Sequence, residues 1–281
     1  MTINWFPGHM NKARRELAKA LSRIDLVIEM VDARLPRSSQ NPMLAELRSD
    51  KPCIKILNRG DLADPVATRE WMEQFDGCNE FVAITLNARQ SGAVRGIPKL
   101  CRRLAPHRVA PGKTIRTMVV GIPNVGKSTL INTLVGRPIE EVGDRPAVTK
   151  GQHRIHLDSG ISVADTPGVL WPKLEDQLGA QRLAASGAIR DTAFDYMQVA
   201  AFASHFLRER YPEVLRERFG MESIPTGQYE ILEAVGRRRG FLKSGGVVDV
   251  QRAAETLLRE LRSGKLGRIS FERPADFPPT P

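Results

Sequence analysis

The sequence predicts an α/β fold, a mostly parallel sheet flanked by helices, followed by a small all-helical domain. Short apolar runs alternate with helical stretches through the first part of the chain, and such alternation favours a parallel sheet covered on both faces. From about residue 176 helical spacing predominates, which predicts a separate second domain. We therefore expect domains at 1–175 and 176–281, a division that suits 281 residues because domains commonly span about 100–200.

The elements follow from apolar spacing and from helix-boundary residues. Strands are expected at 24–31, 52–57, 81–85, 115–120, 153–157 and 161–164, with a further candidate at 268–271. Helices are expected at 9–22, 92–104, 129–135, 177–186, 197–210, 229–238 and 250–262, and another begins at Asp64 and Pro65. The first helix is amphipathic, and its basic residues suit either phosphate contact or a solvated face. The tail from about 274 is expected to be disordered.

Residues 121–128 read G-I-P-N-V-G-K-S, which is a phosphate-binding loop pattern. An expected strand precedes it and an expected helix follows it, as the motif requires. Backbone N–H groups and the helix N-terminus would surround the phosphates. Lys127 would reach the β and γ phosphates as a catalytic group, and the Ser128 hydroxyl would bind Mg²⁺. The residues expected around the phosphates are Asn124, Val125, Gly126, Lys127, Ser128 and Thr129.

A second polar loop, N-R-G-D at 58–61, follows the strand at 52–57 and is the candidate base reader. The Asp61 carboxylate can accept two hydrogen bonds from guanine N1–H and its 2-amino group, which adenine cannot supply. Asn58 would brace the neighbouring loops. The usual motif has lysine where this chain has Arg59, which can still stack on the base but differs in shape and donors. Asn87 and Ala88, after the next strand, resemble the loop whose backbone N–H meets guanine O6.

Two further segments predict a magnesium site and a nucleotide switch. Asp165 opens D-T-P-G and would hold Mg²⁺ through water, while the Gly168 N–H would meet the γ-phosphate. Thr149 is the candidate switch threonine that closes on Mg²⁺ when triphosphate is bound. Many G proteins place glutamine after this motif to orient the attacking water. Here Val169 follows, so the group that positions water must come from elsewhere in the chain.

The order along the chain is base reader, phosphate loop, switch threonine and D-T-P-G, whereas ordinary G domains place the base reader last. This order indicates a circular permutation. Together with W-F-P-G-H-M at 5–10, D-A-R at 32–34 and D-T-P-G-V at 165–169, the chain resembles the YlqF/RbgA family of circularly permuted GTPases, which assist large ribosomal subunit assembly. The resemblance spans nearly the whole chain, and only Arg59 departs from the usual pattern.

The resemblance implies a circularly permuted P-loop G domain followed by an RNA- or ribosome-binding helical domain. It implies a slow GTPase, stimulated by the large ribosomal subunit, that promotes a late assembly step and is released by hydrolysis. Its cofactors would be GTP or GDP, Mg²⁺ and K⁺, and its partners the large-subunit precursor and ribosomal RNA. His9 is similar to the family's candidate water-positioning histidine, although packing against the first helix is the alternative. Asn124 matches an asparagine that helps to bind K⁺, although a turn role is the alternative.

Bulk composition favours a nucleic-acid partner. The formal net charge is +10, and a basic surface attracts polyanions, although a merely basic soluble protein is the alternative. Residues 95–118 are basic without one acidic residue, which suits a phosphate contact or a connecting loop. The 3 cysteines have no metal spacing and fit a reducing compartment. With no apolar run near 18 residues and no signal or transit pattern at the N-terminus, we expect a cytoplasmic monomer without membrane contact.

Three alternatives remain at this point. A GTPase acting on another RNA, such as tRNA, would keep the site and change the partner. An RNA-binding module would keep the nucleotide site only as a structural element, and replacing Lys127 would then leave its function intact. An ATP-hydrolysing phosphate-loop protein is disfavoured by Asp61. The chain also passes from D-T-P-G almost directly into the helical domain, so we expect the switch to pull on that domain.

Overall fold

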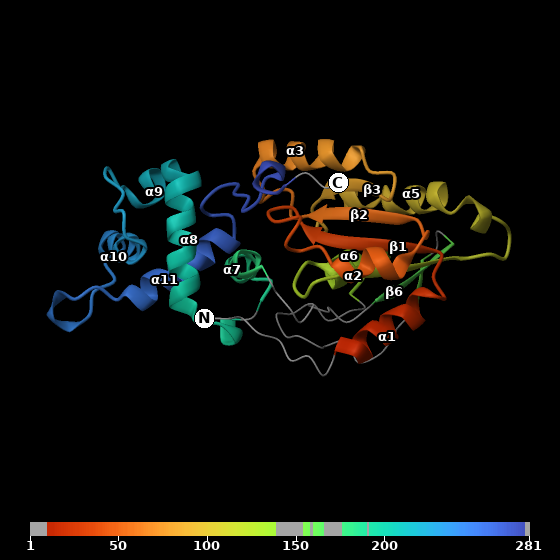
Figure 1. The fold of residues 1–281 in the computed structure, drawn as a ribbon, viewed down its shortest axis with the longest axis horizontal. Coiled ribbons are helices and arrows are strands. Elements are labelled where there is room, and N and C mark those ends of the chain that lie inside the picture. Colours follow the sequence, from red (N-terminus) through yellow and green to blue (C-terminus); the bar gives the residue numbers. More distant parts are fainter. Residues whose placement is uncertain (1–9, 139–153, 158–159, 166–175, 190, 279–281) are drawn as a thin grey trace. The chain divides into compact units, whose positions relative to one another are not determined.

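The computed structural model describes residues 10–138, 154–157, 160–165, 176–189 and 191–278. These residues form two compact units, of which one contains the residues up to 165 together with 272–278 and the other contains 176–271. We call them the sheet unit and the helical unit (Figure 1). The expected α/β sheet followed by a helical region is confirmed. The expected boundary at 175/176 borders residues outside the described part of the chain and stays a prediction.

Six strands make one sheet in the order β3-β2-β1-β4-β6-β5. Their bounds are β1 Leu26–Asp32, β2 Cys53–Asn58, β3 Val82–Leu86, β4 Ile115–Gly121, β5 Arg154–Leu157 and β6 Ile161–Asp165. All neighbouring pairs are parallel except β5 and β6. β1 and β4 are therefore central neighbours, and the loops that follow them meet at one edge of the sheet.

The helices of the sheet unit mostly follow the sequence expectations. They are α1 Met10–Leu21, α2 Pro42–Arg48, α3 Pro65–Asp76, α4 Ser91–Val94, α5 Ile97–Leu104 and α6 Lys127–Val135, with the short 3₁₀ helix η2 Pro106–Arg108. The sequence predicts one helix at 92–104, but the structure has α4 and α5, with Pro98 in the first turn of α5. Helix α2 was not expected from the sequence; Asn41 caps its N-terminus and Pro42 is its first residue.

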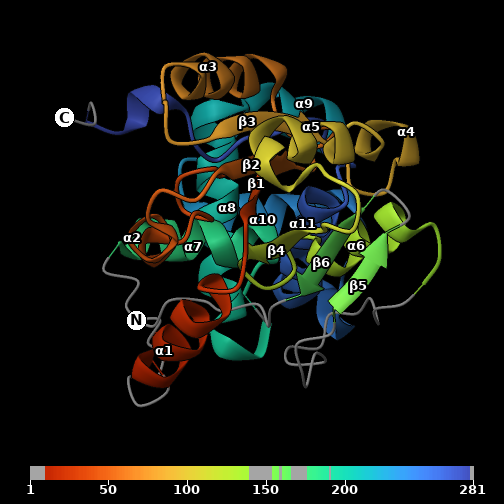
Figure 2. The ribbon, with the colours of Figure 1, turned by 90° about the vertical axis from the view of Figure 1, so that its right-hand side faces the viewer.

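Apolar side chains of β1 pack against helices on one face of the sheet through two core clusters. Val27 lies in a core cluster with side chains from α1 and α2. Val31 lies in a second cluster with Trp71 and Phe75 of α3. Residues two and four apart along a strand share a face, so α1, α2 and α3 cover the same side. Figure 2 shows α4, α5 and α6 on the side opposite α1 and α2.

Asp25, just before β1, forms ion pairs with two arginines of the basic stretch 95–118. Its carboxylate accepts hydrogen bonds from Arg108 at 2.8 and 3.1 Å and from the Arg116 side chain at 2.7 and 3.0 Å. Burial by itself raises the pKa of Asp25, but Arg116 and Arg108 outweigh it and lower the pKa from 3.8 to about 2. These two arginines serve the fold, and only the rest of the stretch suits a phosphate partner.

Asp25→Asn is expected to lower the free energy of unfolding by about 2 kcal/mol at neutral pH. The folded pKa lies below the unfolded one, so this stabilisation is present above about pH 4 and is lost as pH falls toward the folded pKa. Denaturant unfolding of wild type and variant at several pH values measures it, with the exposed Asp76→Asn as control. A wild-type–variant difference that stays constant from pH 6 to pH 2 would contradict the pH-dependent contribution.

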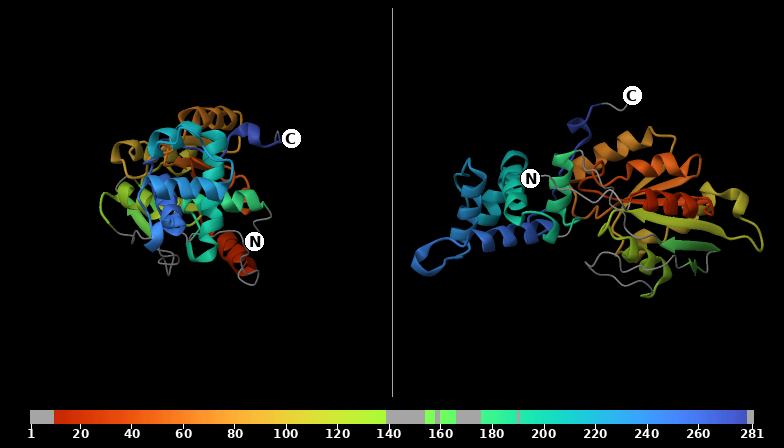
Figure 3. Two further views of the ribbon diagram at one scale, coloured as in Figure 1. Left: turned by 90° about the vertical axis from the view of Figure 1, so that its left-hand side faces the viewer. Right: turned by 60° about the horizontal axis from the view of Figure 1, so that its bottom comes forward.

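The helical unit is built around the helix α8. Its helices are α7 Gln177–Ser186, α8 Tyr196–Arg210, α9 Pro212–Phe219, α10 Gln228–Arg238 and α11 Val250–Arg262, with 3₁₀ turns η3 Asp191–Ala193 and η4 Ser244–Gly246. All four other helices pack against α8, and Figure 3 shows them, coloured from green to blue, from two further sides. The sequence analysis missed α9, where Pro212 follows the end of α8 and opens the next helix.

Two expectations near the C-terminus are wrong. Residues 268–271 form no strand, because the backbone of Ser270 pairs with the Tyr211 hydroxyl and Phe271 is buried beside Phe206. Residues 274–278, expected to be disordered, are ordered, because the 3₁₀ helix η5 Pro274–Asp276 packs against α3. Among the residues that the structure describes, no helix could cross a membrane.

Candidate active site

The phosphate-binding loop connects β4 to α6 and depends on glycine at two positions. Gly126 has φ +105°, and a Cβ there would lie 2.4 Å from Nδ2 of Asn58. A Cβ at Gly121 would lie 2.5 Å from the carbonyl oxygen of Met30. Larger residues would push the loop off its neighbours. No side chain caps the N-terminus of α6 at Gly126, and a helix N-terminus favours an anion such as phosphate.

Lys127, Ser128 and Thr129 form the first turn of α6. The Lys127 side chain is buried, and its Nζ donates to the carbonyls of Gly121 at 3.1 Å and Ile122 at 2.8 Å. The ammonium group is thereby held inside the loop. Ser128 and Thr129 are half-buried. This first turn fits a bound phosphate with an associated cation, and the roles of the three side chains stay predictions.

Asn58 joins three loops at the edge of the sheet. Its Nδ2 donates to the carbonyl of Val125 at 2.7 Å, and its Oδ1 accepts the Ala88 N–H at 2.8 Å. Thr133 of α6 donates to the Ala88 carbonyl at 2.7 Å. Asn58 is 4% exposed, and its side-chain amide hydrogen-bonds to the backbone of both neighbouring loops. Ala88 belongs to the loop expected to meet guanine O6 through a backbone N–H, and its own N–H donates to Asn58.

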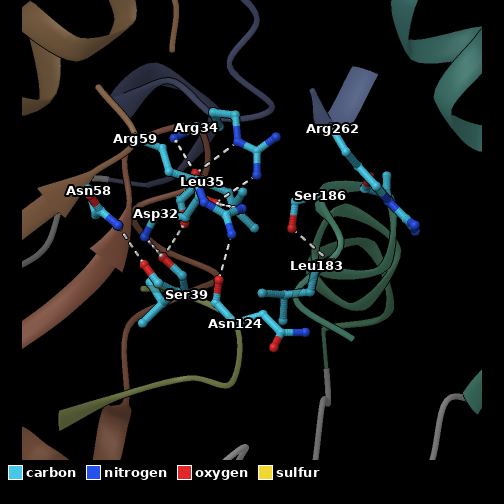
Figure 4. Close-up of polar contacts among 12 residues, drawn as sticks. Asp32, Arg34, Leu35, Ser39, Asn58, Arg59, Asn124, Leu183, Ser186 and Arg262 are labelled. Atoms are coloured by element: carbon cyan, nitrogen blue, oxygen red, sulfur yellow. Dashed lines mark hydrogen bonds and ion pairs between the residues drawn. The ribbon is translucent and has the colours of Figure 1, made fainter. Parts of the chain in front are cut away.

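Arg59 fastens the base-reading loop to the phosphate-binding loop (Figure 4). One terminal nitrogen donates to the Asn124 carbonyl at 2.6 Å and the other to Oδ2 of Asp32 at 3.1 Å. Arg59 and Asn124 both adopt positive φ, +62° and +56°, which is costly for residues other than glycine and concentrates at functional sites. The guanidinium spans two acceptors that a lysine could not serve in the same fork geometry.

Asp32 is the centre of a buried ionic cluster at the end of β1. Its carboxylate accepts Arg34 Nε at 3.0 Å and a terminal nitrogen of Arg34 at 2.8 Å, in addition to Arg59. Burial alone raises the pKa of Asp32, but Arg34 and Arg59 outweigh burial and lower it below its ordinary value. For Arg59 the effect of burial is the larger one and lowers the pKa of the guanidinium, although the negative charge of Asp32 opposes that shift. The D-A-R triplet therefore supports the loop that carries Arg59.

The candidate guanine reader is open to solvent. Asp61 is exposed and follows β2 in the same loop as Asn58 and Arg59. Asn87 is half-buried, and its Oδ1 accepts the N–H of Arg89 at 2.9 Å. Both residues follow neighbouring parallel strands, whose ends meet at one edge of the sheet. An exposed carboxylate at this position is available to a ligand, and the reading of guanine stays a prediction.

Several expected site residues lie outside the described part of the chain, namely His9, Thr149 and Gly168. Asp165 is the last residue of β6, where its backbone pairs in register with Val119 of β4. Two residues after Val119 the phosphate-binding loop begins. The sheet thus brings the end of β6 beside the start of that loop. Asp165 must occupy such a position if it is to hold a cation near the phosphates.

Sequence reasoning did not find the cluster of Asp32, Arg34 and Arg59 as a functional support. A signal was present, because a charged D-A-R triplet directly follows an apolar strand, where unpaired charges are rare. Ser39 was missed as well, and its hydroxyl accepts the N–H of Asp32 at 2.9 Å and donates to the Leu35 carbonyl at 2.7 Å. A serine in a loop gives no such signal in one sequence.

Comparison with known proteins places this site in context. A family model described as a 50S ribosome-binding GTPase matches residues 116–213. Ribosome biogenesis GTPase A of Bacillus cereus is 45% identical over 284 residues, covering 99% of this chain and 96% of the relative. Ribosome biogenesis GTPase A of Thermotoga maritima is 34% identical over 277 residues, covering 99% of this chain and 97% of the relative.

Solved structures agree with the sequence comparisons. The crystal structure of GNP-bound YlqF from T. maritima is 31% identical, covers 95% of this chain and 100% of its own, and superposes with a TM-score of 0.66. A GDP-bound structure of the same protein gives 30% identity and a TM-score of 0.63, with 93% of this chain and 100% of that one covered. The similarity includes both the sheet unit and the helical unit.

Proposed function

Because the chain belongs to the ribosome biogenesis GTPase A family, we propose that it is a GTP-hydrolysing switch for the large ribosomal subunit. It binds that subunit or its precursor, promotes a late assembly step, and is released when GTP is hydrolysed. One observation carries the proposal. Asn58 and Arg59 join a guanine-type N-x-x-D loop directly to the phosphate-binding loop, in a chain that aligns with its relatives almost end to end.

In this proposal the base is read by Asp61, with Asn58 and Arg59 holding the reader in place and the loop at Asn87 and Ala88 closing over guanine. The phosphates lie against residues 124–129 and the N-terminus of α6. Ser128, Thr149 and Asp165 would hold Mg²⁺, the last of them through water, and Asn124 would hold K⁺. Gly168 donates its N–H to the γ-phosphate. When bound there, these cations would supply positive charge against the negative charge that develops on the transferring phosphoryl group.

For hydrolysis, we assign Lys127 to the β and γ phosphates and His9 to orientation of the attacking water. Lys127 is already held within the loop by two carbonyls, so it needs little rearrangement to meet an anion. Subunit binding stimulates a slow basal reaction.

We propose that the domain at 176–281 contacts ribosomal RNA. Of the basic run 237–239, Arg237 and Arg238 are exposed, and Lys243 is exposed nearby. Arg239 instead pairs with Glu260 at 2.9 Å and serves the fold of the helical unit. Exposed basic side chains suit contacts to the RNA backbone.

Co-sedimentation with purified ribosomal subunits tests the proposal. The protein is mixed with large or small subunits in the presence of a non-hydrolysable GTP analogue, GDP or no nucleotide. We expect co-sedimentation with large subunits, strongest with the analogue and weak with GDP. Equal binding to small subunits, or binding that no nucleotide changes, would contradict a large-subunit switch. Binding to tRNA in place of subunits would favour the other RNA-directed GTPase.

A further inference from the structure

The chain returns to the sheet unit after the helical unit, and the returning segment is firmly attached. We call residues 272–277 the strap. Glu272 is fully buried. Its carboxylate accepts the N–H of Arg37 at 2.8 Å, the N–H of Ser38 at 3.2 and 3.3 Å, and the Ser38 hydroxyl. Its carbonyl accepts Trp71 Nε1 of α3 at 3.2 Å.

Two further residues hold the strap on the same surface. One terminal nitrogen of the Arg273 guanidinium lies 3.4 Å from a carboxylate oxygen of Asp64. The other lies 3.6 Å from a carboxylate oxygen of Glu70 in α3. The Phe277 ring lies 6.0 Å from the Trp71 ring, and the Arg37 guanidinium lies 5.4 Å from the Phe277 centroid. The strap therefore binds both α3 and the loop at 34–40 that follows β1.

From the strap, polar contacts continue to the phosphate-binding loop. Glu272 holds the backbone at 37 and 38, and the next residue, Ser39, accepts the N–H of Asp32 at 2.9 Å. The Asp32 carboxylate binds Arg59 at 3.1 Å, and Arg59 binds the Asn124 carbonyl at 2.6 Å. Figure 4 shows the inner part of this series, from Ser39 to Asn124.

The residues just before the strap are fixed in the helical unit. The Tyr211 hydroxyl donates to the Ser270 carbonyl and accepts the Ser270 N–H, both at 3.1 Å. Phe271 is buried, with its ring 5.1 Å from that of Phe206. One peptide bond therefore separates a residue anchored in the helical unit from Glu272, which is anchored in the sheet unit.

We propose that Glu272 is a positioning residue for the nucleotide site, acting through the loop at 34–40, Asp32 and Arg59 on the phosphate-binding loop. The strap thereby links the helical unit to that loop by a route that does not use the switch segments. The inference rests on the proposed function, because it assumes that this loop binds guanine nucleotide.

The test measures the dissociation constant of a fluorescent GDP analogue for the full-length protein. Glu272→Gln replaces one acceptor with an N–H₂ group facing N–H donors, and Ser38→Ala is a milder variant that removes only the hydroxyl contact. We expect the dissociation constant to rise about three- to tenfold for Glu272→Gln and less for Ser38→Ala. Glu260→Gln is the matched control, because Glu260 is a buried carboxylate that binds Arg218 and Arg239 within the helical unit.

A double-mutant cycle separates positioning from general destabilisation. In an Arg59→Ala background the series of contacts is already broken, so Glu272→Gln should have no further effect on GDP binding. Unchanged GDP binding by Glu272→Gln, an equal loss for Glu260→Gln, or an additive effect in the Arg59→Ala background would each overturn the inference. If wild type binds GDP and Glu272→Gln matches it, only this inference fails. If wild type binds no guanine nucleotide, the proposed function fails too.

Discussion

Asp61→Asn is expected to lower kcat/KM for GTP by about 10⁴-fold, because a site built to bond a polar group strongly rejects a mismatched partner. The new side-chain N–H₂ would face the 2-amino group of guanine, donor against donor. Xanthine carries a carbonyl oxygen at that position and keeps N1–H. The variant should therefore hydrolyse xanthosine triphosphate better than GTP. Steady-state hydrolysis of both nucleotides measures this change in preference as a ratio of kcat/KM values.

The matched control for this variant is Asp76→Asn, an exposed aspartate at the end of α3. It should leave both activities at the wild-type level. If Asp61→Asn kept its preference for GTP over xanthosine triphosphate, Asp61 would not be the base reader. Equal use of ATP and GTP by the wild type would point to the ATP-hydrolysing alternative.

Lys127→Ala is expected to reduce kcat for GTP hydrolysis by about 10²- to 10³-fold, the usual cost of removing one donor from a developing negative charge. The ammonium group is buried and aligned by the carbonyls of Gly121 and Ile122, so its removal leaves these carbonyls without the charged donor that they hold. Single-turnover hydrolysis at saturating GTP measures the chemical step without the contribution of product release.

Lys113→Ala provides the control, because this lysine is exposed and lies just before β4. Its hydrolysis rate should equal that of the wild type. Lys127→Ala should also lose nucleotide-dependent release from large subunits. A Lys127→Ala protein that hydrolyses GTP normally would contradict the catalytic role of Lys127. One that loses hydrolysis but still supports subunit assembly would favour the RNA-binding module with a structural nucleotide site.

Local patterns predicted most of the sheet unit, because its motifs lie directly after strands. The phosphate-binding loop occurs between an apolar strand and a helix that ends at Gly136, and the structure has β4 and α6 there. Helix α2 could not be predicted from apolar spacing, because its seven residues are too few to show a helical period. Their cap residues, Asn41 and Pro42, were the available signal.

The support of the site could not be predicted, because it depends on contacts between residues far apart in the sequence. Glu272 and Ser38 are separated by 234 positions, and nothing local marks either residue. The Arg59 departure from the usual lysine was visible in the sequence, but its bond to Asp32 was not. Local composition also gave a wrong expectation for residues 274–278. The prolines there suggest disorder, but Phe277 and Arg273 hold this segment against α3.

GTP hydrolysis in potassium buffer, with and without purified large ribosomal subunits, tests the central claim most directly. The account predicts slow hydrolysis by the protein alone, strong stimulation by large subunits and little by small subunits. Replacing potassium with sodium should reduce the rate if Asn124 holds K⁺. Hydrolysis that large subunits leave unchanged would contradict the claim that the large subunit activates this GTPase, and no hydrolysis under any condition would contradict the GTPase itself.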